Sequence, residues 1–164
     1  MKRLTLIGLL FACTLAGAHA EPAPTAAHKA AVAEIEKIVQ QFQANIINKD
    51  AAALGSLFLP ENNSWLMVLD DDSYAAAQKK KPDVRKVFPS TYGEFVSFVG
   101  ASKKPIEEKF FNVKIDTNGA VGSVYFDFTF HQDGVVSNRG SEAWHMVKTA
   151  DGWKISSMIY SIGH

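Results

Sequence analysis

The C-terminal part of the chain alternates between apolar and polar residues with a period of two. From Val124 to Phe130 every second residue is apolar, and a second alternating stretch runs from Ser137 to Lys148. This period predicts strands with one buried and one solvated face. Asp133-Gly134 lies between the two stretches and suits a tight hairpin turn. A last strand is expected at Trp153–Ser161, where apolar residues on both faces predict burial on both sides.

The N-terminal half instead repeats apolar residues every three or four positions. From Ala30 to Ile46 this spacing predicts the longest helix, with its polar face in water. Asp50 can cap a second, short helix through Phe58. The acids at the start and the lysines at the end of segment 70–81 complement the dipole of a further short helix. Thr91 and Glu94 form a capping box that predicts a helix ending at Gly100.

Two further strands complete the expected elements. Trp65–Leu69 is a short apolar run, and Lys109–Asp116 leads through a turn into the C-terminal strands. Pro82–Pro89 is interpreted as a polar connector, and Gly140 is expected at a bulge that bends its strand. The order of elements predicts an α+β fold with helices packed on one face of a bent sheet.

The first twenty residues have the three parts of a secretory signal. Lys2 and Arg3 are followed by an apolar run from Leu4 to Leu15 and by Ala18-His19-Ala20 before the expected cut. We therefore expect a signal peptide at 1–20, a flexible lead at 21–29 and one domain at 30–164, exported to the periplasm or secreted. Two alternatives remain: a membrane anchor, although the run is shorter than the roughly 20 residues that span a bilayer, and a lipoprotein with Cys13 at its cleavage box.

Charge and composition exclude several classes of function. Removal of the signal takes away Cys13, the only cysteine, which excludes disulfides and thiol nucleophiles. It also reduces the number of Lys and Arg residues from 17 to 15 against 17 acidic residues, a net charge of −2 that makes nucleic acid an unsuitable partner. The four remaining histidines lie in different segments, and no phosphate-binding glycine loop or dinucleotide motif is present. We expect no metal, no cofactor and, after removal of the signal, no membrane span.

Four local patterns stand out along the chain: Asn48-Lys49-Asp50 after the long helix, Leu57-Phe58, Gly140-Ser141-Glu142-Ala143-Trp144 with Val147-Lys148, and Asp151-Gly152-Trp153-Lys154-Ile155. Together they resemble the nuclear-transport-factor-2-like superfamily, which includes ketosteroid isomerases and polyketide-cyclase-like proteins. The likeness covers nearly all of residues 30–161. It implies a cone-shaped, curved antiparallel sheet with three N-terminal helices packed on its concave face. It implies no reaction, because this fold supports many unrelated activities.

The resemblance also implies a pocket inside the curved sheet and a homodimer formed through its outer face. The side chains expected to face the pocket are Phe126, Phe128, Phe130, Glu142, Trp144, Met146, Met158 and Tyr160. Glu142 is the exception in this apolar set, because a buried carboxylate costs several kcal/mol unless it is paired. A raised pKa would make it a candidate acid or base. Alternatively, Glu142 lies near the mouth of the pocket or pairs with Lys or Arg.

Two classes of function follow from these residues. The first is a secreted, non-catalytic domain that binds a small apolar ligand or a protein partner. The second is a small acid/base enzyme, such as a dehydratase, cyclase or isomerase, that uses Glu142. The resemblance argues against a ketosteroid isomerase, because the strand 65–69 holds no carboxylate and Trp144 stands where the oxyanion-binding acid is expected. A reaction based on Asp127 and His145 is disfavoured because both are expected on the outer face.

Overall fold

The chain enters the fold through its longest helix, α1 (Ala26–Asn48), in a computed structural model that describes residues 25–163. The Thr25 hydroxyl caps this helix by accepting a hydrogen bond from the His28 backbone at 3.1 Å. The helix starts at Ala26, four residues before the expected start, within the predicted lead. Its buried residues recur every three or four positions: Ala31, Ile35, Val39, Phe42 and Ile46. The predicted signal peptide lies outside the described residues.

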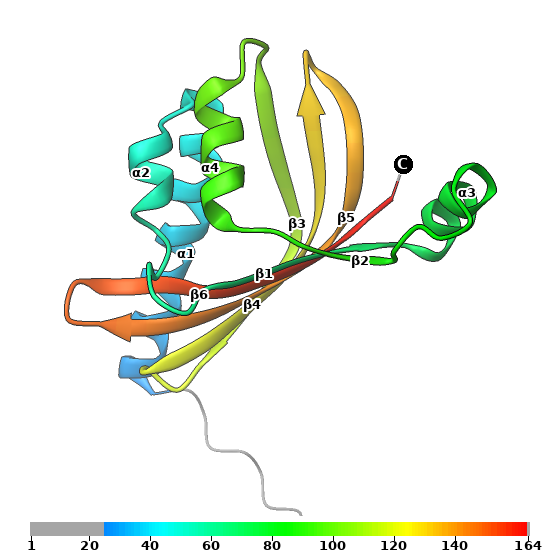
Figure 1. Cartoon of the computed structure of the whole chain (residues 1–164). Helices are drawn as coiled ribbons and strands as arrows, with labels where there is room; N and C mark the ends of the chain where they lie inside the picture. The colour runs from blue at the N-terminus through cyan, green and yellow to red at the C-terminus, as the bar shows by residue number, and fades with distance from the viewer. Residues whose placement is uncertain (1–24, 164) are drawn as a thin grey trace, which may run out of the picture.

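Two shorter helices pack beside α1 and with it cover the concave face of the sheet (Figure 1). They are α2 (Ala51–Gly55), capped by Asp50, and α4 (Tyr92–Ala101), which begins with the capping box of Thr91 and Glu94. The expectation of three helices on the concave face is therefore confirmed. A fourth helix, α3 (Asp71–Lys80), buries none of its residues and stands away from the other three (Figure 1).

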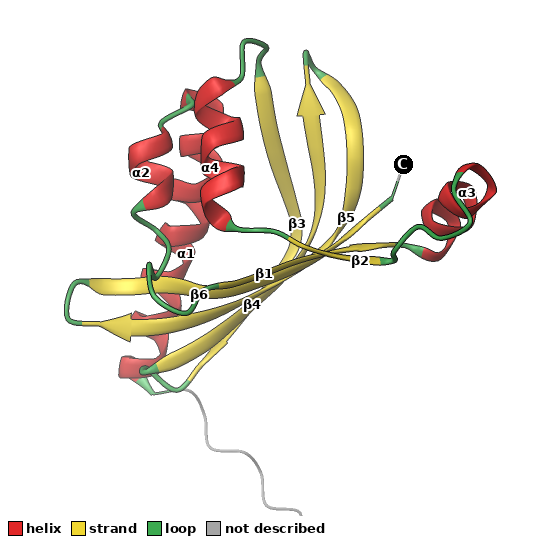
Figure 2. Cartoon of the chain, in the orientation of Figure 1, coloured by secondary structure: helices red, strands yellow, loops and turns green. Residues whose placement is uncertain are grey.

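Six strands form one curved sheet in the order β2-β1-β6-β5-β4-β3 (Figure 2). Their bounds are Ser64–Leu69 (β1), Val87–Pro89 (β2), Ile106–Thr117 (β3), Val121–Gln132 (β4), Val135–Thr149 (β5) and Gly152–Ile162 (β6). All neighbouring pairs are antiparallel except β1 and β6, so the sheet is mixed rather than wholly antiparallel. The three-residue strand β2 lies in the segment expected to be a connector, where it pairs with β1 at the edge.

The prediction of a bulge at Gly140 is wrong. Gly140 pairs in register with Phe128, and the extra residue on β5 is Ser137, between the pairs of Phe130 and His131. Gly140 is needed for a different reason: a Cβ atom at this position would lie 2.0 Å from the carbonyl oxygen of Ser161 on β6. Glycine therefore lets two strands approach closely.

A second bulge decides which residues of β6 face the helices. His145 pairs with Ser157 and Met146 pairs with Ile155, so Ser156 is an extra residue on β6. The bulge changes the alternation, and Ile155, which is fully buried, lies on the same side as Met158, while Ile159 is 46% exposed. The prediction that β6 is buried on both sides is therefore wrong. Its buried residues occupy odd positions before Ser156 and even positions after it, because Ser156 is an extra residue in the strand.

Aromatic rings from both layers form the core between the helices and the sheet. The Trp144 indole is fully buried, with its ring centroid 4.8 Å from that of Phe42 on α1 and 5.1 Å from that of Phe126 on β4. Within residues 25–163, no helix is long and apolar enough to cross a membrane. The core thus joins α1 to the centre of the sheet.

Candidate functional site

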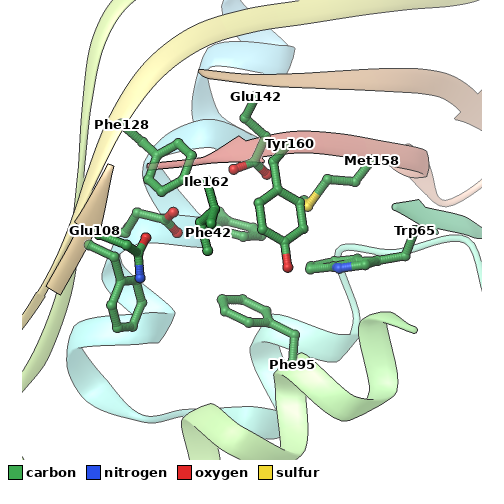
Figure 3. A pocket seen from close by; sticks show the side chains of 11 residues that line it. Phe42, Trp65, Phe95, Glu108, Phe128, Glu142, Met158, Tyr160 and Ile162 are labelled. Atoms are coloured by element: carbon green, nitrogen blue, oxygen red, sulfur yellow. The ribbon is translucent and has the colours of Figure 1, made fainter. Parts of the chain in front are cut away.

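A cavity of about 120 Å³ lies between the concave face of the sheet and the helices α1 and α4 (Figure 3). Every strand except β2, together with these two helices, contributes to its wall. The residues lining it are Phe42, Trp65, Phe95, Glu108, Phe128, Phe130, Asn138, Glu142, Met158, Tyr160 and Ile162. The wall is therefore mostly aromatic, with four polar side chains from β3, β5 and β6.

Glu142 is a buried acid on β5 whose carboxyl group faces this cavity (Figure 3). Residues two apart on a strand share a face, and Trp144 donates a hydrogen bond from its indole Nε1 to Glu142 Oε1 at 2.6 Å. Burial raises the pKa of Glu142 to about 8, and the hydrogen bond from Trp144 opposes this rise only in part. Neither alternative for Glu142 is observed: it is 3% exposed, and none of the described residues forms an ion pair with it.

Glu108 is a second buried acid in the same wall (Figure 3). It alternates with Ile106 and Phe110 along β3, so it points to the concave side together with them. Burial raises the pKa of Glu108 well above its usual range, and the nearby charge of Glu142 raises it further. Within residues 25–163 no side chain donates a hydrogen bond to the Glu108 carboxyl group. The cavity thus has two acids that favour the neutral form.

Tyr160 on β6 adds a phenol to the polar groups of the cavity. Its ring meets those of Trp65 and Phe128 edge-on, at centroid distances of 5.9 and 6.4 Å. Burial raises the pKa of Tyr160 above its usual value, and the two glutamates add to this rise. Near neutral pH the Tyr160 hydroxyl and the two carboxyl groups can all donate or accept hydrogen bonds. The carboxyl groups can also release or take up a proton.

The structure separates the eight predicted pocket residues into two groups. Five of them line the cavity: Phe128, Phe130, Glu142, Met158 and Tyr160. The other three, Phe126, Trp144 and Met146, face the same side but lie in the core and do not line it. Parity along a strand selects the side of the sheet, whereas the position of the cavity depends on which rings leave a gap between them.

The sequence-based pocket prediction missed Glu108 and every other lining residue that comes from outside the C-terminal strands. The strand was predicted to begin at Lys109, two residues after Glu107. In the structure Ile106, Glu108 and Phe110 alternate on one face of β3, and this alternation is the sequence signal that indicates an inward-facing Glu108. Other missed lining residues are Phe42, Trp65, Phe95, Asn138 and Ile162.

Asp127 and His145 lie on the outer face, as the sequence predicts, and neither lines the cavity. The Asp127 carboxylate accepts hydrogen bonds from Asn112 and Ser141 at 2.8 Å each, which lower its pKa. The His145 Nδ1 lies 2.8 Å from the Ser157 hydroxyl. In the described part of the chain, no group of three or more His, Cys, Asp and Glu residues is arranged to hold a metal ion.

Solved structures with a similar fold include several nuclear-transport-factor-2-like proteins. One of unknown function from Shewanella baltica has a TM-score of 0.59 and 14% identity, covering 84% of this chain and 97% of its own. A protein from Novosphingobium aromaticivorans, provisionally named a scytalone dehydratase, has a TM-score of 0.63 and 13% identity, covering 84% and 87%. A provisional dehydratase from Streptomyces avermitilis has a TM-score of 0.60 and 17% identity, covering 83% and 98%.

No protein-family model and no curated protein matches the sequence. Identities of this size between the chain and the solved structures establish a common fold and leave the reaction open. The order of the strands, the concave helices and these structural matches agree with the resemblance carried by the sequence. The chain therefore has the nuclear-transport-factor-2-like fold.

Proposed function

We propose that the chain binds a small, predominantly apolar molecule in this cavity, with a polar group of that molecule against Glu108, Glu142 and Tyr160. The observation that carries this proposal is a buried carboxyl group, that of Glu108, which faces an aromatic cavity and has no donor among the described side chains. The Glu108 oxygens open onto the cavity. A molecule that fills the cavity must therefore satisfy them, because a polar group sealed from water without a partner costs about 1 to 3 kcal/mol.

The size of the cavity limits the molecule. Apolar cavities of about 150 Å³ hold a benzene-sized molecule, and this one measures about 120 Å³. A single ring or a branched aliphatic group with one polar substituent fits such a volume. Larger molecules need movement of α4, which supplies Phe95 to the wall.

Ligand-observed NMR with single-ring compounds tests the proposal, together with native mass spectrometry of the chain from Glu21 for molecules that copurify. Ile162→Phe places a larger side chain in the cavity wall and should abolish binding. Ile159→Phe is the matched control, because Ile159 is on the outer face and 46% exposed. Absence of binding across the compounds, or equal loss in both variants, would refute the proposal.

A second candidate function is acid/base catalysis on the bound molecule. The observation that favours it is the raised pKa of Glu142, about 8, which lets one carboxyl group hold or accept a proton near neutral pH. Titration of Glu142 by carboxyl-carbon NMR separates the two candidates. A value near the ordinary 4.3 or so removes catalysis by this group, whereas a value raised by two units or more, with turnover that Glu142→Gln abolishes, supports it.

A homodimer through the outer face and export through the signal peptide complete the proposal. Apolar side chains exposed by about half lie on the outer face of the sheet, among them Phe111, Tyr125 and Ile159. Isolated exposed apolar residues are common on monomers, but neighbouring ones mark contact surfaces. Light scattering on the Tyr125→Lys variant should show a monomer where the unaltered chain shows a dimer. Fractionation of cells should find the chain outside the cytoplasm with its first 20 residues removed.

A further inference from the structure

We infer that the molecule bound in the cavity is a small organic cation, an amine or ammonium group on a body the size of one ring, with its charge against Glu108 and Glu142. This inference rests on the proposed function, because it names the class of ligand for the same cavity. It is drawn from the charges that face the cavity and from the rings around them (Figure 3).

The ionisable groups that face the cavity are all acids. Two carboxyl groups and one phenol line it, and none of its described lining residues is a lysine, an arginine or a histidine. The nearest lysine in sequence to Glu108 is Lys109, whose Nζ lies 3.4 Å from Glu107 on the outer side of the strand. Buried acids in proteins are usually paired with cations, since an unpaired buried charge is costly. Here the protein supplies no such cation.

Hydrogen bonding leaves most of the carboxyl oxygens available to a ligand. The described residues give Glu142 one side-chain donor, the Trp144 indole, at 2.6 Å, and give Glu108 none. Four carboxylate oxygens can accept several hydrogen bonds each. An ammonium group offers up to three donors together with a positive charge, and so meets both requirements at once.

Aromatic rings form most of the rest of the wall, and the faces of such rings attract cations. The rings of Phe42 and Phe95 stack with centroids 5.9 Å apart, and the Trp65 and Phe95 centroids are 5.4 Å apart. Tyr160 extends this wall beside Trp65 (Figure 3). A cation within about 6 Å of such ring centres gains about 0.5 to 2 kcal/mol from the ring quadrupole. Carboxyl groups and aromatic rings facing one cavity are the combination that selects an organic cation over a neutral molecule.

Binding of a cation at this site should release a proton from the protein. Burial raises the pKa of both Glu108 and Glu142, that of Glu142 to about 8, so the empty cavity retains a carboxyl proton at pH 7. A cation favours the ionised carboxylates, and its binding therefore expels a proton. A neutral molecule that accepts a hydrogen bond from the protonated pair expels none.

Benzylamine and benzyl alcohol are a matched pair of probes, because they differ chiefly in charge and benzylamine is protonated at neutral pH. We expect isothermal titration calorimetry at pH 7 to show benzylamine binding at least tenfold more tightly than benzyl alcohol. Titrations in two buffers with different ionisation enthalpies should show release of about one proton with benzylamine and none with benzyl alcohol. Glu108→Gln and Glu142→Gln should each weaken benzylamine binding at least tenfold.

Glu107→Gln is the control, because Glu107 is adjacent to Glu108 in sequence but has a side chain 42% exposed and paired with Lys109. It should leave the affinity unchanged. Equal or tighter binding of benzyl alcohol, or benzylamine binding without proton release, would overturn the inference and leave the proposed binding function intact. If no compound of either kind binds, the proposed function itself fails.

Discussion

Replacing Glu142 with glutamine should weaken the pH dependence of the stability of this protein between pH 5 and pH 8, leaving the part that Glu108 contributes. Glutamine keeps the shape of the side chain and an oxygen that can accept the hydrogen bond from Trp144. Unlike glutamate, glutamine has no proton to release in this pH range. The carboxyl group it replaces is 3% exposed and has its pKa raised by burial from 4.5 to about 8.

The direction of the effect follows from proton counting. Between pH 4.5 and pH 8 the unfolded chain has released the Glu142 proton while the folded chain retains it, so the free energy of unfolding falls as the pH rises. Each unit of pKa difference corresponds to about 1.4 kcal/mol, which gives about 5 kcal/mol over the whole interval. Below pH 4.5 Glu142 is protonated in both the folded and the unfolded state, so it no longer makes the stability depend on pH. Glu108, whose pKa is also raised, acts in the same direction.

Urea unfolding at pH 5, 6, 7 and 8 measures the effect on the unaltered chain and on two variants. The unaltered chain should lose stability by up to about 1.4 kcal/mol for each pH unit through Glu142 alone, and Glu108 should add to this loss. Glu142→Gln should show a flatter profile and exceed the unaltered chain in stability at pH 8, whereas Glu107→Gln should follow the unaltered chain. Stability that stays level or rises towards pH 8 in the unaltered chain would show that Glu142 is already ionised in the fold, and would refute the reasoning.

Three further predictions concern the packing that holds the site. Trp144→Ala should lower the free energy of unfolding by about 3 to 5 kcal/mol in urea titrations, because the indole is fully buried; a loss under 1 kcal/mol or so would contradict its core position. Gly140→Ala should lower it by about 1 to 3 kcal/mol, since the new Cβ would overlap a carbonyl oxygen on β6, while Gly93→Ala, with only the Thr91 hydroxyl at 3.8 Å, should be neutral or stabilising. Thr91→Ala removes the cap of α4, and thermal unfolding should show a loss of about 1 kcal/mol that a serine at the same position restores.

The sequence predicted the strands well where a strand keeps its alternation. The parity of β4 and β5 placed Phe128, Glu142 and Trp144 on the concave side, and all three are buried there. It failed on β6, because Ser156 is an extra residue that no local pattern marks. The sequence Trp153–Ser161 is compatible with a strand buried on both sides and with a strand containing a bulge. Only the register against β5 distinguishes them, and register is a property of the pair of strands.

The site was harder to predict than the fold because it is made where elements far apart in the chain meet. Glu142 could be identified from one strand, since an acid among inward aromatic residues is a local contradiction of the pattern. The acidity of the cavity, however, depends on Glu108 as well as on Glu142. Glu108 is on β3, which β4 separates from β5 in the sheet. The two acids become a pair only because the sheet curves around α1 and turns β3 and β5 towards the same space. A local pattern can therefore indicate that a buried acid exists, but the chemistry depends on the curvature that brings a second acid to the same cavity without a compensating cation.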